Sequence, residues 1–446
     1  MTGSPRWLAA LATLGVALLE CAPASADEPK RLVPDYDGRG PEPTTPGNGA
    51  LWVPRVVFFP LYLTSEFVIR RPLGALVVAA ERSHLPRVLY DFFAFGPDHK
   101  AGFAPIAFVD FGFNPSVGLY LFWDDAFGKD NDLRLRGATW GSRWLAGSLT
   151  DRLHLHGKDT LALNVTAVRR PDHAYFGLGP RTLQSDLSRY SEDRIEGSAA
   201  MELRLWRASE LKTGVGVRTV SLYHGDYWSD PSLEQESAAG AFPLPYGFDR
   251  GYTAPYSHAL AALDTREPRP APGSGIRLEI EGEQGGDVSH VPGSSWLRYG
   301  AAAGGFLDLN DHGRVLSLTV AALFADPLGA APIPFTELVS LGGDAPMPGF
   351  WAGRLVDRSA AVATLQYRWP IAPFLDGTMQ VATGNVFGVH LAEFQPGLLR
   401  ISGAVGVASV GSPDSSIEFK VGFGSETIDH GGQVDTLRVV LGANRF

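Results

Sequence analysis

The chain has 446 residues, of which 52 are glycine, 19% are charged and 11% are aromatic. Its length allows several ordinary domains or one large β-barrel, and this composition favours strands and turns over helices. The formal net charge of −10, without a cluster of basic residues, argues against a nucleic-acid-binding protein.

The first 26 residues have the pattern of a secretory signal peptide. Arg6 supplies the positive charge, residues 7–19 form an apolar core too short to span a bilayer, and residues 24–26 form a cleavage site. Cys21, the only cysteine, lies inside this segment. We therefore expect an exported chain without disulfides.

Two segments separate this signal from the strands. Residues 27–50 hold five prolines and are expected to be a disordered, proline- and glycine-rich lead-in. Residues 51–101 space their apolar residues as a helix does, but prolines such as Pro54 and Pro72 divide the pattern into short pieces. Such a segment is either a small periplasmic cap or a plug that enters a barrel.

From Phe103 onward, apolar and polar residues alternate, which is the period of a β-strand. No later segment offers the uninterrupted apolar run of a transmembrane helix. The pattern predicts sixteen strands. Their ranges are 103–111, 117–124, 132–141, 143–153, 159–168, 194–206, 210–222, 256–266, 274–283, 295–306, 312–324, 357–369, 376–386, 398–409, 415–424 and 435–446.

The lengths of the connections separate a soluble sandwich from a membrane barrel. Connections after even-numbered strands are short, whereas several after odd-numbered strands are long, at 169–193, 223–255, 325–356 and 387–397. That asymmetry is typical of outer-membrane barrels, whose closure also removes the sheet edges that lipid does not tolerate. The sequence therefore predicts an all-β membrane protein, a 16-stranded antiparallel transmembrane β-barrel over residues 102–446 with a short N-terminal helical segment.

Aromatic residues support a bacterial outer-membrane location. Tyr367 and Trp369 lie at the expected periplasmic end of a strand, on the face that lipid would contact, where an aromatic girdle belongs. The chain ends on Phe446, and a terminal aromatic residue on the last strand is the usual insertion signal of such barrels. We therefore expect outer-membrane lipid and, during insertion, the barrel assembly machinery as partners.

Four motifs occur in order between residues 264 and 387. They are Asp264-Thr265-Arg266-Glu267-Pro268 followed by Gly275, a loop with Gly342-Gly343 and Met347-Pro348-Gly349-Phe350, then Tyr367-Arg368-Trp369-Pro370, and Ala382-Thr383-Gly384-Asn385-Val386-Phe387. They resemble the Asp-x-Arg-x-x-Pro-x-x-Gly hairpin, the inward-folding loop, the Tyr-Arg-x-Pro strand end and the Asp-x-Gly-x-Val-Phe strand of the BamA/TamA family. That family belongs to the bacterial surface antigen superfamily.

The resemblance implies a barrel that assembles outer-membrane proteins or translocates cargo, through a seam between its first and last strands. It also implies a loop folded into the lumen. The residues of this loop and its supporting motifs would be Gly342, Gly343, Gly349, Phe350, Arg354, Tyr367, Arg368, Gly384, Asp264 and Arg266. The same barrel is also compatible with a passive pore or a structural outer-membrane protein, because a fold does not fix a function. The cargo is unknown.

The chain departs from the family at two places. Pro348 stands where the family has its loop arginine, and Ala382 stands where the family has the aspartate partner. Arg354 or Arg358 would replace the arginine, with Asp344 or Asp357 as partner, but we favour the interpretation that both arginines are solvated loop charges. Residues 27–102 also lack recognisable POTRA repeats, the modules with which the family binds unfolded clients.

Motifs of common enzymes are absent. The sequence has no Gly-x-Ser-x-Gly, no phosphate-binding loop and no His-Glu-x-x-His. His154 and His156 share a strand face, but two histidines without a third ligand are more often incidental. We therefore expect no enzyme activity, no metal and no cofactor.

Charged residues alternate with apolar ones on several strands and would point into the lumen. Two interpretations remain open: these residues line an aqueous path, or they form a salt-bridge network that stiffens a plugged barrel. These residues are Arg134, Arg136, Arg204, Arg277, Arg368, Arg438, Glu202, Glu279, Glu281 and Glu418.

Overall fold

The computed structural model describes residues 92–96, 98–155, 158–267, 273–291, 293–309, 313–372, 375–410 and 417–443. The expected signal peptide (1–26), the lead-in (27–50), residues 51–91 of the expected helical segment and the terminal Phe446 lie outside the described residues.

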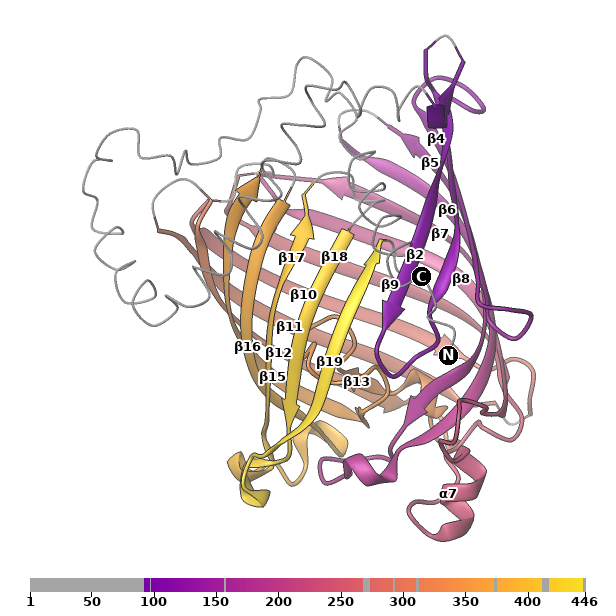
Figure 1. The fold of residues 1–446 in the computed structure, drawn as a ribbon, viewed down its shortest axis with the longest axis vertical. Helices are drawn as coiled ribbons and strands as arrows, with labels where there is room; N and C mark the ends of the chain where they lie inside the picture. The colour runs from indigo at the N-terminus through magenta and orange to yellow at the C-terminus, as the bar shows by residue number, and fades with distance from the viewer. Residues whose placement is uncertain are drawn as a thin grey trace, which may run out of the picture.

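Sixteen strands form one antiparallel barrel (Figure 1), in which each strand pairs with its neighbours in the chain and β19 pairs with β2 to close the sheet. The strands are β2 (Ala101–Asp110), β3 (Ser116–Asp124), β4 (Asn131–Thr139), β5 (Leu145–His154), β6 (Thr160–Tyr175), β7 (Ser188–Arg204), β8 (Glu210–His224), β9 (Tyr252–Asp264), β10 (Gly275–Gly286), β11 (Ser295–Asp308), β12 (Val315–Pro327), β15 (Ser359–Ala372), β16 (Leu375–Phe387), β17 (Arg400–Ser409), β18 (Ile417–Ser425) and β19 (Val434–Ala443).

The predicted fold class is confirmed, and each strand overlaps a predicted range. The largest difference lies between β6 and β7, where the expected long connection 169–193 shortens to residues 176–187. The register shifts between Arg170 and His173, which leaves Pro171 outside the ladder, and the pairing of β6 with β7 continues beyond it. Within the expected helical segment, Ala94–Phe95 is a short strand, β1, that pairs with the start of β2.

The two ends of the barrel differ in their connections. At one end, short turns such as 125–130 and 205–209 join the strands, and we call this the short-turn end. At the other, the long-loop end, residues 225–251 contain helix α7 (Leu233–Ala239), which lies beyond the barrel at the bottom of Figure 1. No described helix is long and apolar enough to cross a membrane.

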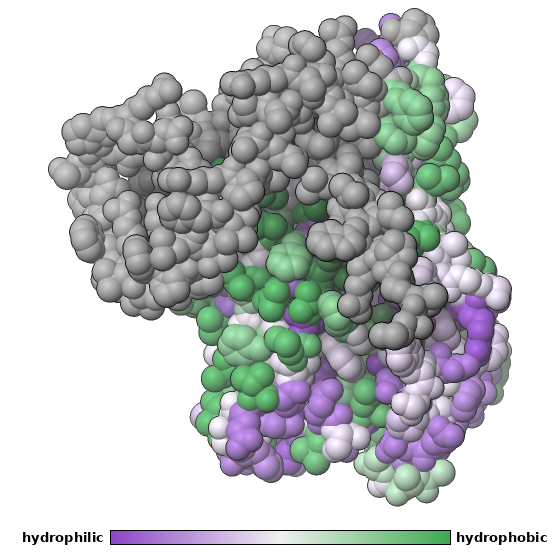
Figure 2. All heavy atoms as spheres, in the orientation of Figure 1, coloured by the Kyte–Doolittle hydropathy of each residue, from purple (hydrophilic) through white to green (hydrophobic). Residues whose placement is uncertain are grey.

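The two faces of the sheet have opposite polarity. On β10, Leu278 and Ile280 are 49% and 64% exposed on the outer face, whereas Arg277 and Glu279 form ion pairs on the other face. Figure 2 shows hydrophobic side chains over the wall of the barrel and hydrophilic ones toward the long-loop end. Such a wall suits a hydrocarbon environment rather than water.

The largest apolar core fills the long-loop end. It is organised by the lumenal loop, residues 328–358, whose strands β13 (Val339–Leu341) and β14 (Leu355–Asp357) form a small hairpin. Leu341, Met347 and Phe350 of this loop are fully buried, and they belong to the same cluster as Tyr175 and Trp296. The lumenal loop is therefore a packed part of the barrel at this end.

Candidate functional site

The contact between β19 and β2, which we call the seam, is short. Among the described residues it consists of three residue pairs, Val440↔Asp110, Leu441↔Val109 and Gly442↔Phe108. By contrast, β7 and β8 form fifteen pairs, from Tyr190↔His224 to Arg204↔Glu210. Because each ladder hydrogen bond adds only about 0.5–1.5 kcal/mol, the seam is the weakest junction among the described strand pairs of the barrel.

One buried ion pair crosses the seam. Arg438 of β19 donates from Nη2 to Asp110 Oδ2 of β2 at 2.6 Å, and its Nε lies 3.2 Å from both carboxylate oxygens. Both side chains are 4% exposed. A buried pair with several hydrogen bonds is hard to break one partner at a time, because the remaining charge is left uncompensated.

The same arginine also holds the lumenal loop. Its Nη1 donates to the carbonyl oxygens of Gly343 and Pro348, the latter at 3.3 Å, and Asp344 lies 3.6 Å from Nη2. The guanidinium therefore joins β2, β19 and the loop in one cluster.

The tip of the lumenal loop, residues 347–350, lies directly on the wall next to the seam. The Gly349 N–H donates to Ser402 Oγ of β17 at 2.9 Å, and a Cβ at Gly349 would overlap the Phe423 carbonyl of β18. Gly424 similarly leaves room for the Phe350 ring, and Gln380 of β16 donates to the Pro346 carbonyl at 2.5 Å. Glycine at position 349 is thus required for the close approach of loop and strand.

The two positions that correspond to the charged residues of the family motif, Pro348 and Ala382, carry no charge in this chain. At Pro348 only the carbonyl takes part in the contact with Arg438, and Ala382 of β16 is buried without a charge. The arginine comes instead from β19 and its acid from β2. Sequence reasoning identified Arg438 as a lumenal charge but missed Asp110, because nothing in the spacing of a strand-end aspartate marks a partner 328 residues away.

The expectation that Arg354 is a solvated charge is wrong. Its side chain is fully buried, donates to Thr182 Oγ1 at 2.6 Å and lies 3.5 Å from Asp435 of β19, and not beside Asp344 or Asp357. Burial, together with the nearby Arg400 guanidinium, lowers the pKa of Arg354 to about 10.

Arg354 belongs to a second cluster at the long-loop end. Arg400 of β17 is also fully buried, pairs with Glu426 at 2.9 Å and donates to the Thr182 carbonyl at 2.7 Å. The loop 176–187 is thereby bound to the lumenal loop and to the last strands. Arg358, by contrast, is 31% exposed and pairs with Asp326 at the rim.

The base of the lumenal loop has a third anchor. Glu337 is fully buried and accepts from Arg218 of β8 at 3.0 Å and from the Tyr252 hydroxyl of β9 at 2.5 Å. Arg298 of β11 lies 3.5 Å from the same carboxylate. The loop is therefore bound to opposite walls, by Glu337 at its base and through Arg438 at its tip.

The remaining predicted residues lie away from the loop tip. Asp264 and Arg266 form an ion pair at 2.6 Å at the short-turn end of β9. The rings of Tyr367 and Trp369 stack at 5.4 Å, and Arg368 between them points the other way, 3.7 Å from Asp376. Gly384 packs against Val362 and the Ala361 carbonyl, so these motifs shape the wall rather than the loop contact.

The lumenal charges form a network. On β7 to β10, the single carboxylate of Glu210 forms three ion pairs, with Arg204 at 2.9 Å, Lys212 at 3.3 Å and Arg277 at 2.9 Å. Arg277 also reaches Glu279 at 2.5 Å. Of the two interpretations left open, this pairing supports a salt-bridge network that stiffens the wall.

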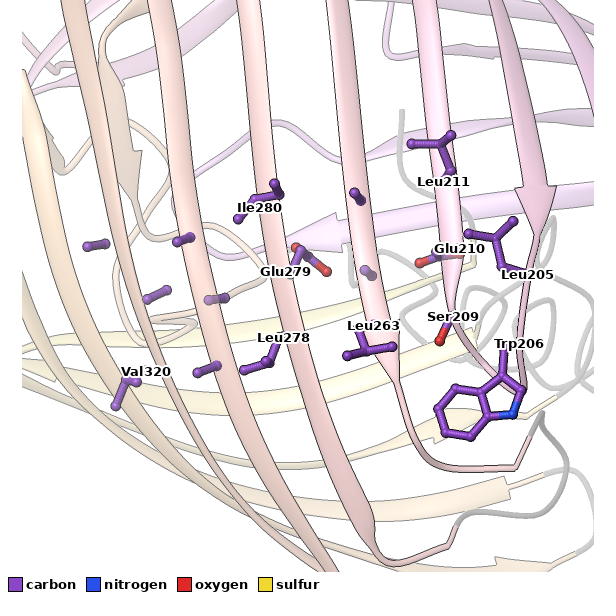
Figure 3. A pocket seen from close by; sticks show the side chains of 17 residues that line it. Leu205, Trp206, Ser209, Glu210, Leu211, Leu263, Leu278, Glu279, Ile280 and Val320 are labelled. Carbon is purple, nitrogen blue, oxygen red and sulfur yellow. The ribbon is translucent and has the colours of Figure 1, made fainter.

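Two other features lie apart from the loop and the seam. His154 Nε2 lies 2.8 Å from Asp132, His156 is outside the described residues, and the described part of the chain holds no group of three potential metal ligands. A shallow apolar depression of about 980 Å³ lies over β8 to β12, and Figure 3 shows Leu263, Leu278 and Ile280 on adjacent strands, with Trp206 at a turn.

Comparisons with known proteins show which proteins the chain is similar to. The model of the Omp85 superfamily domain matches residues 126–393. Among solved structures, BamA from Haemophilus ducreyi lacking POTRA domains 1–3 is similar, with a TM-score of 0.52 and 14% identity over 77% of this chain and 70% of that one. CdiB from Escherichia coli has a TM-score of 0.50 and 12% identity over 78% of this chain and 64% of that one. Among curated proteins, none matches.

Proposed function

Because the chain belongs to the Omp85 superfamily of outer-membrane assembly and translocation barrels, we propose that it inserts or passes polypeptide cargo by opening the seam between β2 and β19. The observation that carries the proposal is the seam itself, with three residue pairs and one buried ion pair against fifteen residue pairs between β7 and β8. Among the described strand pairs of the barrel, the next shortest junction, between β17 and β18, has seven residue pairs, so opening there would break about twice as many ladder hydrogen bonds.

The lumenal loop supports a controlled opening over a passive pore. Its core residues Leu341, Met347 and Phe350 are fully buried at the long-loop end, where a pore would need an aqueous path. Arg438 binds both the loop and Asp110, so displacement of the loop tip weakens the seam. In this mechanism the loop acts as the latch and the seam as the gate.

A reversible disulfide across the seam tests the proposal. Because the Phe111 N–H donates to the Val439 carbonyl, Phe108 and Gly442 form a non-hydrogen-bonded pair, in which side chains lie closest. We expect a Phe108→Cys/Gly442→Cys chain, in a Cys21→Ser background, to reproduce the deletion phenotype in cells that hold no other copy. The phenotype is read as the levels of outer-membrane and secreted proteins, and a reductant should restore them.

The matched control joins β18 to β19, away from the seam. Val421→Cys/Val439→Cys uses a pair of the same geometry inside the barrel wall and should leave function unchanged. If the locked seam also leaves function unchanged, the proposal is wrong. Single-channel recordings in planar bilayers separate the passive-pore alternative, because a pore would conduct equally with the seam locked or free.

A further inference from the structure

The outer wall has a hollow over β8 to β12, the shallow apolar depression of Figure 3, which we call the groove. In an antiparallel sheet, directly paired residues point to the same face. Ala301 therefore shares the outer face with its partners Ile280 of β10 and Ala322 of β12. Ala303 likewise shares it with Leu278 of β10. The short side chains of the alanines form the floor of the groove, and the longer side chains beside them form its borders.

On other strands the same face carries larger side chains. One row of paired residues across β3 to β6 consists of Leu121, Leu135, Leu149 and Val165, all of them exposed on the outer face. A row across the groove passes instead through Ala261, Ala301 and Ala322. Between apolar surfaces in a membrane, attraction depends on van der Waals contact. The groove therefore offers a lipid acyl chain more contact than the row on β3 to β6 does.

Trp206 and Arg207 lie at one end of the groove, in the turn that joins β7 to β8. Trp206 is 54% exposed and lines the groove (Figure 3). Its turn belongs to the short-turn end, which in outer-membrane barrels faces the periplasm. Tryptophan is enriched where a membrane meets water, at the level of the lipid headgroups. This end of the groove therefore lies at the headgroups of the periplasmic leaflet.

Arg207 brings a positive charge to the same end of the groove. Its guanidinium carbon lies 4.9 Å from the centre of the Trp206 ring, and its Nη1 donates to the Thr265 carbonyl at 2.6 Å. Among the described residues, its ion pair is with Glu267, at 3.7 Å, and both side chains are exposed. Such an exposed pair contributes little. The guanidinium is therefore available to a phosphate group, which arginine can bind through two parallel hydrogen bonds.

We propose that the groove binds a phospholipid of the periplasmic leaflet, with one acyl chain over the alanines and its phosphate at Arg207. The charge of Arg207 and the length of the groove both fit this occupant. Because the groove crosses five strands that lie about 4.8 Å apart, it is roughly 19 Å long, which is comparable with the roughly 15 Å of hydrocarbon in one leaflet.

The proposed lipid site lies on the opposite side of the barrel from the seam. Counted from β2, β10 is the ninth of the sixteen strands of the barrel, so the groove is half a turn away from the junction of β2 and β19 (Figure 1). A lipid bound there would tie this wall to the membrane whether or not the seam opens. The site therefore goes beyond the proposed function and does not depend on it.

Native mass spectrometry of the full chain in detergent, titrated with dipalmitoyl phosphatidylglycerol, tests the site. We expect one lipid to bind before any others. Arg207→Gln should weaken this first binding about tenfold, because a charge-assisted hydrogen bond to the phosphate is lost. Ala303→Leu should weaken it several-fold, because the larger side chain fills the groove. Dipalmitoylglycerol, which has the same acyl chains but no phosphate, should not show the first binding.

Two matched variants serve as controls. Lys158→Gln removes an exposed charge from another turn of the short-turn end. Ala199→Leu enlarges an alanine of β7 that lies on the outer face, since it pairs with the exposed Leu163, but outside the groove. Both variants should bind the first lipid as the unaltered chain does. Heat-modifiable migration on gels confirms that each variant is folded.

A phosphatidylglycerol with a photoreactive diazirine in one acyl chain shows where the lipid lies. The full chain is reconstituted in phosphatidylethanolamine vesicles that contain a small share of this lipid. After illumination, we expect residues 301–303 and 320–322 to be labelled several-fold more than Leu121 and Leu149. Arg207→Gln should remove this excess.

Three results would overturn the inference: first binding that Arg207→Gln leaves unchanged, first binding of dipalmitoylglycerol equal to that of phosphatidylglycerol, and labelling that is equal over the whole wall. Dimers that carry no lipid and that Ala303→Leu dissociates would identify a second copy of the chain as the occupant of the groove, and would overturn it as well.

Discussion

The wall from β7 to β10 and the seam between β19 and β2 are built by opposite means. The wall has long strands, with fifteen residue pairs between β7 and β8, and a network in which Glu210 has three cationic partners. The seam has three residue pairs among the described residues, and one buried ion pair, Asp110–Arg438, crosses it. At the wall, many hydrogen bonds and ion pairs share the stabilisation of the strand junctions. At the seam, one ion pair provides much of it, so the loss of that single contact would be enough to open the junction.

The largest expected effect comes from removing that contact. Arg438→Ala leaves the Asp110 carboxylate buried without a partner, and should lower the free energy of unfolding by about 3–5 kcal/mol. Urea unfolding in lipid vesicles, followed by tryptophan fluorescence, measures the change.

The control for this variant removes both charges. Arg438→Met/Asp110→Leu leaves no buried charge, so it should cost much less than Arg438→Ala, although the bonds to the loop carbonyls are lost. If the single and double variants lower the free energy of unfolding equally, the Asp110–Arg438 ion pair is not the main stabilising contact of the seam. The proposed difference between seam and wall would then be wrong.

The next effect concerns the close approach of the lumenal loop to the wall beside the seam. Gly349→Ala places a Cβ against the Phe423 carbonyl, and should cost about 1–3 kcal/mol by displacing the loop tip. Limited proteolysis should then cut the loop 342–353 faster. Gly305→Ala, where a Cβ meets no atom within 4 Å, is the control and should leave the loop resistant.

The sequence predicted the barrel well because its signals are local. Alternation and connection length located all sixteen strands, and the motifs placed the lumenal loop. What it missed depends on closure of the barrel, since Arg438 and Asp110 meet only when the last strand reaches the first. Arg354 was misjudged for the same reason, because its burial depends on Thr182, 172 residues away, which no spacing rule connects to it.

At the wall, loss of one acid should have a smaller effect because neighbours remain paired. Glu210→Gln should cost about 1–2 kcal/mol, since Arg204 keeps Glu202 and Arg277 keeps Glu279. Glu281→Gln on the same face is the control, because the described ion pairs do not include Glu281, and it should change stability little. A loss at Glu210 as large as that of Arg438→Ala, by the same urea unfolding, would show that the wall is not a shared network.

The smallest effect is a dependence on pH at the long-loop end, where Asp429 pairs with Arg181 at 3.0 Å and joins the loop 426–433 to the loop 176–187. A hydrogen bond from Thr427, followed by the Arg181 guanidinium, lowers the pKa of Asp429 to about 2. Because this pKa is below the ordinary value of about 3.9, the stabilisation is fully present above that value and is lost as the pH falls through about 2. Amide hydrogen exchange at residues 428–431, compared with the Asp429→Asn variant at each pH, should show protection that converges with the variant only at the acidic end. If protection does not change with pH, packing and not the Asp429–Arg181 ion pair holds the two loops together. Of these two ion pairs, only Asp110–Arg438 at the seam would then contribute to the stability of the barrel.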